Sequence, residues 1–585
     1  MQENGNSDVS LINKELKRTF WTKNKWMFFI SVLCLSVLSA LNVYISVLMQ
    51  QIIDIIAEHD LERVIHVSLY SLGTFVCLII VYLIQRQTCP AFIRRAITQY
   101  KEYVFERLLQ KNLRTVSLEN TSKYISLLTN DVNSIENNYL SPLFTFFMDI
   151  MGLIIAVIVM FVYSPLLAIL AIVFAFLPVC ISLLSGNKLA DAEKTVSAQN
   201  EDFVNSVKEI FCGFFVIKTF QVEREMLTLF RSENNQTELA KFHRRKTSEL
   251  VNLLAMGSGI FAQLGIFIAA AIYSIHGKGI TPGTVIIFLN LMNFIVSPIM
   301  SIPTIFANRK ATFELINKMA NLLFEQSVIS GNIIHSQLEK EIDIENLSFA
   351  YDHCESVLKN VSVRFEKGKS YAIVGPSGSG KSTLLNVLLR TNNTYQGQVK
   401  IDGIELKDIK QSSVYELFSV IHQNVFIFNG SLKENITLFK EYSDIQLNNV
   451  IKLAGLSELV TSKGMDYICG ENGANLSGGE RQRISIARCL LHATDVLLVD
   501  EATASLDCIT AADILNSVLD LQDMTKIVVT HYLEESALKR FDFIISISNG
   551  KVCEIGPFDE LMEQKNLLYS MMMSRRLYRE ELPFD

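Results

Sequence analysis

A glycine-rich segment carries the clearest chemical signal in the sequence. Gly375–Thr383 reads GPSGSGKST, follows a buried-strand pattern at Ser370–Val374 and leads into a helical pattern that begins at Leu384. Such a loop lets backbone N–H groups surround phosphate oxygens, and the dipole of the following helix favours the negative charge. We expect Lys381 to reach the β- and γ-phosphates of a nucleotide and the Ser382 hydroxyl to ligate Mg²⁺. The phosphate-binding residues that this motif predicts are Gly375, Pro376, Ser377, Gly378, Ser379, Gly380, Lys381, Ser382 and Thr383.

Two adjacent carboxylates follow a second apolar run. The sequence from Asp495 reads DVLLVDE, and four apolar residues followed by Asp500 and Glu501 are typical of a buried strand with acids at its C-terminal end. Nucleotides bind at that edge of a parallel sheet. We expect Asp500 to hold Mg²⁺ through water, and Glu501 to orient and deprotonate the water that attacks the γ-phosphate. Together the two segments predict an α/β domain that binds ATP with Mg²⁺ and hydrolyses it.

Further motifs occur in the order found in ATP-binding-cassette (ABC) proteins, and the sequence resembles that family. The segment NLSGGERQR at 475–483 resembles the ABC signature sequence, and His531 in VVTHY resembles the switch histidine. Gln423 in VIHQNVFIF resembles the Q-loop glutamine, and Tyr351 in LSFAY resembles the adenine-stacking aromatic. An SLD triplet that ends at Asp507 resembles the D-loop, for which ALD is a common form.

The resemblance implies which residues contact ATP and Mg²⁺. In this family, the signature of one cassette completes the ATP site of a second cassette that faces it. The residues implied in hydrolysis are Lys381, Gln423, Glu501 and His531, and those implied in holding Mg²⁺ are Ser382, Gln423 and Asp500. Beyond the glycine loop, the residues implied in nucleotide binding are Tyr351, Ser477, Gly478, Gly479, Glu480 and Asp507.

The resemblance also implies that two copies work together. The chain holds one cassette and no internal repeat, and its own motifs are intact, so a homodimer with two competent sites is the simplest arrangement. ATP would be clamped between Lys381 of one copy and Ser477 of the other. Closure would turn a membrane cavity outward, and hydrolysis would reset it, as a shift between two populations. By resemblance, the membrane half contacts a cassette near residues 112–124 and 209–215.

Six apolar segments precede the cassette, and each is long enough to cross a bilayer as a helix. They are Trp26–Met49, Ile65–Ile84, Leu140–Val162, Leu166–Leu184, Leu250–Tyr273 and Val285–Phe306. The predicted fold is an α-helical transmembrane bundle, six helices with long cytoplasmic extensions, fused to an α/β P-loop ABC ATPase domain. The predicted parts are an interfacial N-terminal helix at 1–25, a transmembrane domain at 26–325, a linker at 326–340 and a nucleotide-binding domain at 341–585.

The distribution of basic residues predicts the orientation. Lys and Arg gather before the first segment and after the second, whereas the connection 50–64 between them carries Arg63 alone. Basic residues stay on the cytoplasmic side, so both termini are predicted to be cytoplasmic in a multi-pass protein of a cell membrane, most simply a bacterial inner membrane. Ile12, Leu16 and Phe20 recur every fourth residue and predict a helix that lies along the inner leaflet.

The inner connections 85–139 and 185–249 are long, charged and helical in pattern. A helix from Ile65 to about Asn112, with a kink at Pro90, would be roughly 70 Å long. The bilayer takes only about 30 Å of that length. The sequence therefore predicts stalks that project from the membrane.

The substrate is the least defined feature. Asp149 lies within the third segment, where a charge costs a few kcal/mol unless it faces water or a partner. It can attract a cationic drug or peptide, or it can be a protonated or hydrogen-bonded packing acid. Asn290, Asn293 and Ser297 recur at helical spacing, and they either line the same cavity or hold helices together. Drug, peptide and lipid substrates all remain open.

Composition excludes other classes of function. The net charge of −7 argues against a nucleic-acid partner, because phosphate backbones bind to clustered Lys and Arg. The ten cysteines form no C-x-x-C pair, so neither a zinc site nor a disulfide framework is indicated. Six spans exclude a soluble cassette ATPase. An ATP-gated channel or regulatory receptor on the same scaffold is the alternative to an ATP-driven exporter of an amphipathic drug, peptide or lipid.

Overall fold

The computed structural model describes residues 2–58, 60–111, 115, 121–276, 280–324, 331–351, 355–391, 394–501 and 508–580. Contacts divide the chain into two units: residues 1–111 with 119–325, and residues 112–118 with 326–585. The first unit is helical, and the second carries both β-sheets.

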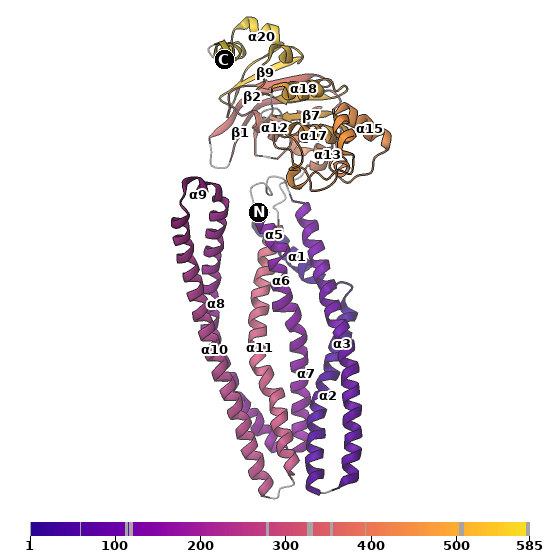
Figure 1. Cartoon of the computed structure of the whole chain (residues 1–585), viewed down its shortest axis with the longest axis vertical. Helices are drawn as coiled ribbons and strands as arrows, with labels where there is room; N and C mark the ends of the chain where they lie inside the picture. The colour runs from indigo at the N-terminus through magenta and orange to yellow at the C-terminus, as the bar shows by residue number, and fades with distance from the viewer. Residues whose placement is uncertain are drawn as a thin grey trace. The chain divides into compact units, whose positions relative to one another are not determined.

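Long helices make up most of the first unit (Figure 1). They are α1 (Gln2–Thr19), α2 (Lys25–Glu58), α3 (Leu61–Leu109), α5 (Thr121–Leu128), α6 (Asn130–Ile135), the π-helix η1 (Glu136–Leu140), α7 (Ser141–Tyr163), α8 (Pro165–Cys212), α9 (Phe214–Phe220), α10 (Glu223–Ile275) and α11 (Pro282–Leu323). Within the described residues, five helices are long and apolar enough to cross a membrane, and α8 adds a shorter apolar stretch at Pro165–Cys180. The six predicted segments fall within these helices, apart from Leu140, which ends η1.

The helices are much longer than a bilayer requires. Helix α3 has 49 residues, α8 has 48 and α10 has 53. At 1.5 Å per residue, each is about 70 to 80 Å long, more than twice the hydrocarbon thickness. Helix α3 runs without interruption through Pro90. The predicted long stalks are therefore present as continuous helices.

Helices occupy most of the predicted connection 50–64. Helix α2 continues to Glu58 and α3 begins at Leu61, so the sequence prediction made this connection too long. The reason is a small apolar cluster in which Leu48 and Ile55 of α2 pack with Val67 of α3. Two further bonds anchor the end of α2, because Asp54 accepts from the Thr281 hydroxyl at 2.7 Å and from the Gly283 N–H at 2.9 Å.

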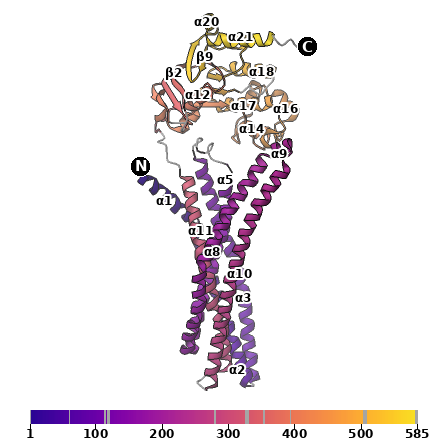
Figure 2. The same cartoon turned by 90° about the vertical axis from the view of Figure 1, so that its left-hand side faces the viewer.

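Helices α8 and α10 run side by side, and α9 connects their ends (Figures 1 and 2). Their polar sections are joined by an ion pair between Arg244 and Glu193 at 2.6 Å. Helix α9 and its neighbours expose aromatic rings to solvent, and Phe215 is 78% exposed. Exposed aromatic residues at the end of a polar hairpin are unusual and indicate a contact surface.

The N-terminal helix packs on protein. The side chains of Leu16 and Phe20 are fully buried, in a cluster formed with α3 and α11. The Phe20 ring stacks on that of Tyr100 in α3, with ring centroids 4.9 Å apart. Ile12 and Leu16 thus lie in a helix, Phe20 directly follows its last residue, and other helices of the same unit cover Leu16 and Phe20.

The second unit contains a four-stranded and a six-stranded sheet. The strands are β1 (Glu341–Ala350), β2 (Ser356–Glu366), β3 (Ser370–Val374), β4 (Gln396–Ile401), β5 (Ile404–Glu405), β6 (Phe418–Ile421), β7 (Val496–Asp500), β8 (Thr525–Val529), β9 (Phe543–Ser548) and β10 (Lys551–Gly556). The antiparallel sheet has the order β2-β1-β4-β5, and the larger sheet has the order β10-β9-β3-β8-β7-β6. In the larger sheet all neighbours are parallel except β10 with β9.

Helices cover the larger sheet, and two apolar cores lie on its faces. The helices of this unit are α12 (Lys381–Leu388), η2 (Leu406–Asp408), α13 (Gln411–Leu417), α14 (Leu432–Thr437), α15 (Asp444–Leu453), α16 (Ser457–Lys463), η3 (Glu471–Gly473), α17 (Gly478–His492), α18 (Cys508–Leu519), α19 (Glu535–Leu538), α20 (Phe558–Gln564) and α21 (Leu567–Glu580). Successive strand residues alternate between the cores: Leu498 packs with the smaller sheet, whereas Val499 packs with α14 to α18. Both faces of β7 are therefore buried, and polar residues lie only at the ends of the strand.

Candidate ATP site

Four adjacent parallel strands deliver the predicted residues to one edge of the larger sheet. The order β3-β8-β7-β6 places four strand ends in a row. The glycine loop follows β3, His531 follows β8, Asp500 and Glu501 end β7, and Gln423 follows β6. Because carboxyl ends of parallel strands share an edge, residues far apart in the sequence come together there.

The glycine loop encloses a buried ammonium group. Lys381 is only 4% exposed, and its Nζ donates to the carbonyl oxygens of Gly375 at 3.1 Å and Pro376 at 2.9 Å. Burial lowers the pKa of this ammonium, while the charges of Glu501 and Asp500 act in the opposite direction. The loop thus holds a positive charge that can form strong, charge-assisted hydrogen bonds with phosphate oxygens.

Two observations on the loop fit a polyphosphate. The Ser379 hydroxyl is buried and has no hydrogen-bond partner among the described residues, so it is free to donate to a phosphate oxygen. A side chain could not replace the loop glycines: a Cβ on Gly375 would lie 2.0 Å from the carbonyl oxygen of Ile547, and Gly380 has a φ of +102°. The backbone is thus held in a conformation that residues with side chains rarely adopt.

The Ser382 hydroxyl donates to Asp500 Oδ1 at 2.7 Å. This pair supplies two hard oxygen atoms beside the glycine loop, the kind of ligand that Mg²⁺ prefers together with substrate phosphates. Within the described residues, no group of three or more His, Cys, Asp or Glu could hold a metal ion. The Ser382–Asp500 pair therefore offers Mg²⁺ two protein oxygen atoms beside the loop, which fits an ion that phosphate oxygens help to hold.

The side chains of Glu501 and His531 contact each other at the strand ends. The distance from His531 Nε2 to Glu501 Oε1 is 2.7 Å, and both side chains are partly exposed. Glu501 has a φ of +49°, which few residues other than glycine adopt. Its backbone N–H donates to the Val529 carbonyl at 3.2 Å, which fixes this turn to β8. Unusual backbone conformations of this kind gather at functional sites.

Tyr351 lies directly after β1, beside the helix that follows the glycine loop. Its hydroxyl is 3.3 Å from Thr383 Oγ1, and its ring meets Phe349 edge-on at a centroid distance of 4.9 Å. The side chain is 39% exposed. A ring supported at one edge, with an exposed face, is suited to stacking on a planar base.

The signature segment forms the N-terminus of α17. The Ser477 hydroxyl accepts from the Glu480 N–H at 3.2 Å, and the Glu480 carboxylate accepts from the Ser477 N–H at 2.6 Å. This is a capping box. Lys463 lies 3.6 Å from the Glu480 carboxylate. Ser477 is exposed, and among the described residues no hydrogen bond or ion pair links it, Gly478 or Gly479 to the glycine loop. The predicted signature residues thus form a separate, capped helix N-terminus.

Two family profiles match the chain. The profile described as "ABC transporter transmembrane region" matches residues 28–299, and the one described as "ABC transporter" matches residues 358–504. Together they cover more than two thirds of the sequence, in the order that one-chain exporters have.

The chain belongs to the ABC transporter family.

Relatives of this ABC transporter match it over most of its length. The ATP-dependent lipid A-core flippase of Syntrophus aciditrophicus is 26% identical over 93% of this chain and 91% of its own. The putative multidrug export ATP-binding/permease protein YgaD of Bacillus subtilis is 28% identical over 79% of this chain and 81% of its own. A bacterial Atm1-family ABC exporter with ATP bound shares the fold, with a TM-score of 0.80 at 20% identity over 94% of this chain and 99% of that one. The transporter is a half-size exporter that couples ATP hydrolysis to transport.

The Q-loop of the transporter connects the sheet to the signature helix. The Gln482 side chain donates to the backbone carbonyls of Gln423 at 3.0 Å and of His422 at 3.4 Å. Gln423 also lines a cavity of about 320 Å³ together with Gly478 and Arg481. The structure therefore brings Gln423 next to the signature helix, and among the described residues no hydrogen bond joins it to the Ser382–Asp500 pair.

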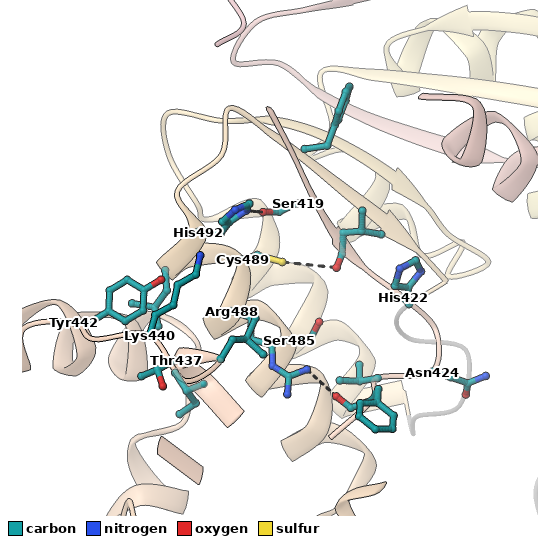
Figure 3. Close-up of a pocket in the computed structure, with 17 residues that line it drawn as sticks. Ser419, His422, Asn424, Thr437, Lys440, Tyr442, Ser485, Arg488, Cys489 and His492 are labelled. Atoms are coloured by element: carbon teal, nitrogen blue, oxygen red, sulfur yellow. Dashed lines mark hydrogen bonds between the residues drawn. The ribbon is translucent and has the colours of Figure 1, made fainter. Parts of the chain in front are cut away.

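A larger hollow of about 400 Å³ also borders the Q-loop (Figure 3). Arg488 crosses it from α17: its guanidinium donates to the Phe426 carbonyl at 2.7 Å and to the Asn435 carbonyl at 2.7 Å. Lys440, Tyr442 and His492 stand along its rim. These bonds tie α14, the Q-loop and α17 into one rigid group.

Sequence reasoning missed Gln482 and Arg488, which position the Q-loop. Both occur in the stretch ERQRISIAR, and the available signal was a pair of polar side chains on the apolar side of a helix. Among the predicted residues, Asp507 lies outside the described residues.

Proposed function

We propose that the chain works as a homodimeric exporter in which each ATP is bound between the glycine loop of one copy and the signature helix of the other. The observation that carries this proposal is the separation of two anion-binding ends on one cassette. Lys381, Ser379 and Ser382 provide one end, and Ser477 with the N-terminus of α17 provides the other. Each end is half of a phosphate clamp. In a dimer, the glycine loop of each copy pairs with the signature helix of the other copy, so both clamps are complete.

The roles of the residues follow from their contacts. Lys381 turns from the loop carbonyls to the β- and γ-phosphates, and the Ser379 hydroxyl donates to a phosphate oxygen. Glu501 accepts a proton from the attacking water, and His531, bonded to the same carboxylate, holds it in place. Tyr351 stacks on the adenine. Bound at Ser382 and Asp500, with Gln423 as a third ligand, Mg²⁺ would supply charge that offsets the phosphate charge.

Asp507 and Gly479 would add to the clamp in the closed dimer. Glu480 acts through the capping box: its carboxylate holds Ser477 in position and would repel a phosphate at closer range. The signature contacts are therefore expected from the hydroxyl and backbone N–H groups of 477–479, with Glu480 as a positioning residue.

We further propose a cell-membrane location, in a bacterial inner membrane, with both termini in the cytoplasm. The clustered basic residues that flank α2 and the end of α3 support this orientation. The proposed parts are an interfacial segment at 1–25, a transmembrane domain at 26–325, a linker at 326–340 and a nucleotide-binding domain at 341–585. The exposed aromatic residues of α9 are the surface that we propose to contact a cassette, so that closure there shifts the membrane helices between inward and outward states. The substrate would be an amphipathic drug, peptide or lipid.

The test compares ATP hydrolysis by a single copy of the protein with hydrolysis by two copies in the same nanodisc. Full-length protein is placed in lipid nanodiscs that contain either a single copy or two copies, and ATP hydrolysis per copy is measured at saturating Mg²⁺-ATP. Hydrolysis should be confined to discs with two copies. Equal hydrolysis per copy in single-copy discs would exclude the shared site.

A further inference from the structure

The exposed side of α11 is mostly polar, which is unusual for a helix in a membrane domain. From Thr284 to Phe306, the exposed residues among those described are Asn293, Ser297, Thr304 and, at the end of the stretch, Phe306. The other large apolar side chains described in this stretch are buried, as Phe288 and Leu291 are, or half-buried. A helix that faced lipid would show the opposite pattern.

Helix α3 shows that opposite pattern within the same unit. From Ile65 to Ile84 its exposed residues are mainly large and apolar, including Phe75, Ile80 and Leu83, and only Val67 and Thr74 are buried. Helix α3 is therefore suited to contact lipid. The exposed side of α11 is suited to water, to a polar ligand or to a second copy.

A carboxylate lies beside this polar side. Ser301 of α11 donates to Asp149 Oδ2 of α7 at 2.6 Å, and Asp149 is partly exposed. Among the described residues, Ser301 is the only hydrogen-bond partner of Asp149, and no Lys or Arg lies within ion-pair distance of it. A carboxylate at membrane depth requires a counter-charge or a proton. The Ser301 hydroxyl bonds one oxygen of the Asp149 carboxylate, and no cationic side chain of the described residues pairs with this group. The other oxygen can therefore bind the positive charge of a ligand.

An aromatic pair lies one helical turn from the carboxylate. Phe146, three residues before Asp149 on the same face of α7, meets Phe306 of α11 edge-on at a centroid distance of 6.0 Å. Phe306 is 52% exposed. Two turns before Ser301 on α11, Asn293 accepts a hydrogen bond from Gln263 of α10. A carboxylate with an aromatic pair one turn away suits a ligand with a positive head and an apolar body.

We propose that Asp149 and Ser301 form the charge-recognising part of the substrate site, and that the substrate class is a monovalent organic cation with an apolar or aromatic body. This inference rests on the proposed export function and narrows it from three substrate classes to one. The Asp149 carboxylate provides the counter-charge, Ser301 holds its orientation, and Phe146 with Phe306 contacts the apolar body. The face formed by Asn293 and Ser297 continues the polar lining along α11.

The test uses two probes of equal size and opposite charge. Tetraphenylphosphonium and tetraphenylborate differ in charge but hardly in shape, and their binding to nanodisc-embedded protein without ATP is measured against empty nanodiscs. Wild-type protein should bind the cation more tightly than the anion. Asp149→Asn should weaken cation binding by about tenfold or more and leave anion binding unchanged or stronger. Asp149→Glu should keep the preference for the cation.

Asp54→Asn is the matched control, because Asp54 is also a hydrogen-bonded carboxylate of this unit but lies at the far end of α2. It should leave the ratio of cation to anion binding unchanged. Equal loss of both probes in Asp149→Asn, the same loss in Asp54→Asn, or a wild type without cation preference would each overturn the proposal. If Asp149→Asn does not fold, the wild-type preference and its retention in Asp149→Glu decide alone. Because these measurements need no ATP, they can fail while the one-copy and two-copy hydrolysis test succeeds.

Discussion

The glycine-loop end and the signature end of the cassette, which we propose bind the phosphates, are built in different ways. The glycine-loop end is buried in the sheet edge: Lys381 is 4% exposed, and Ser382 is bonded to the neighbouring strand through Asp500. The signature end is exposed, and its main polar contacts are the capping box within the first turn of α17. One end is fixed by long-range strand pairing, the other by bonds between residues three apart.

This difference assigns different tasks to the two ends. A buried cation and a constrained loop provide most of the binding energy for a triphosphate, because their charge acts in a low-dielectric surrounding. An exposed helix N-terminus attracts a phosphate more weakly. This attraction becomes stronger once a second surface excludes water from the helix end. The buried end should therefore determine whether ATP binds, and the exposed end should determine whether two copies close on it.

Lys381→Ala would remove the buried cation and should have the largest effect. We expect ATP affinity to fall by about 100-fold or more, with loss of hydrolysis and of transport, since no other positive side chain of the loop replaces it. Binding of a fluorescent ATP analogue to purified protein measures this effect. A variant that still transported would show that the glycine loop is not the working site.

Glu501→Gln tests whether binding and turnover are separate at the buried end. The amide keeps the size of the side chain but cannot take the proton from water, so we expect hydrolysis to fall by about 10² to 10⁴ while ATP binding persists. Closed dimers should accumulate with ATP and can be detected by cross-linking. Near-normal hydrolysis would remove Glu501 from the proposed role.

Ser477→Ala tests the exposed end, and pairing it with Lys381→Ala tests the sharing of sites. Alone, the change should reduce hydrolysis about tenfold, because it removes a hydroxyl donor and weakens the cap of α17 by roughly 1 kcal/mol. A mixed dimer of a Lys381→Ala copy with a Ser477→Ala copy keeps one intact shared site, and it should retain about half of the wild-type hydrolysis.

The control for that mixture carries both substitutions on one copy and none on the other. One shared site then lacks Lys381 and the other lacks Ser477, so hydrolysis should fall to about one twentieth of wild type, the product of one remaining site and the tenfold effect of Ser477→Ala. If the wild-type copy of this control still hydrolysed ATP while the first mixture did not, each chain would contain a complete site of its own.

Local patterns predicted those parts of the fold that local forces determine. Ser370–Val374 forms β3 as predicted, because an apolar run ending in glycine has few alternatives to a buried strand. The apolar segments likewise form helices, since a bilayer's length and its lack of water impose them. Family motifs then assigned Tyr351, Gln423 and His531 to the ATP site, which spacing alone could not do, and the structure places them directly after or close to the ends of β1, β6 and β8.

The features that sequence could not predict depend on contacts between distant residues. The bond from Ser301 to Asp149 joins positions 152 apart, and the bonds from Thr281 and Gly283 to Asp54 extend α2 where a loop was predicted. The lack of a hydrogen-bond partner for the buried Ser379 hydroxyl among the described residues can be recognised only in the packed structure. Such contacts depend on which helices or strands become neighbours, and periodicity carries no information about that choice.

Glu480→Gln should have the smallest effect and distinguishes the two interpretations of Glu480. If the side chain is part of the capping box, glutamine can still accept from the Ser477 N–H, and hydrolysis should stay within about twofold of wild type. If Glu480 were instead a direct nucleotide ligand, removing its charge would change ATP affinity. Glu480→Ala provides the counterpart, because it removes the reciprocal bond and should lower stability by about 1 kcal/mol. Thermal unfolding and ATP titration of both variants separate the effects: an unchanged affinity in Glu480→Gln with a lower melting temperature in Glu480→Ala assigns the residue to the cap, since only a positioning role depends on the hydrogen bond and not on the charge.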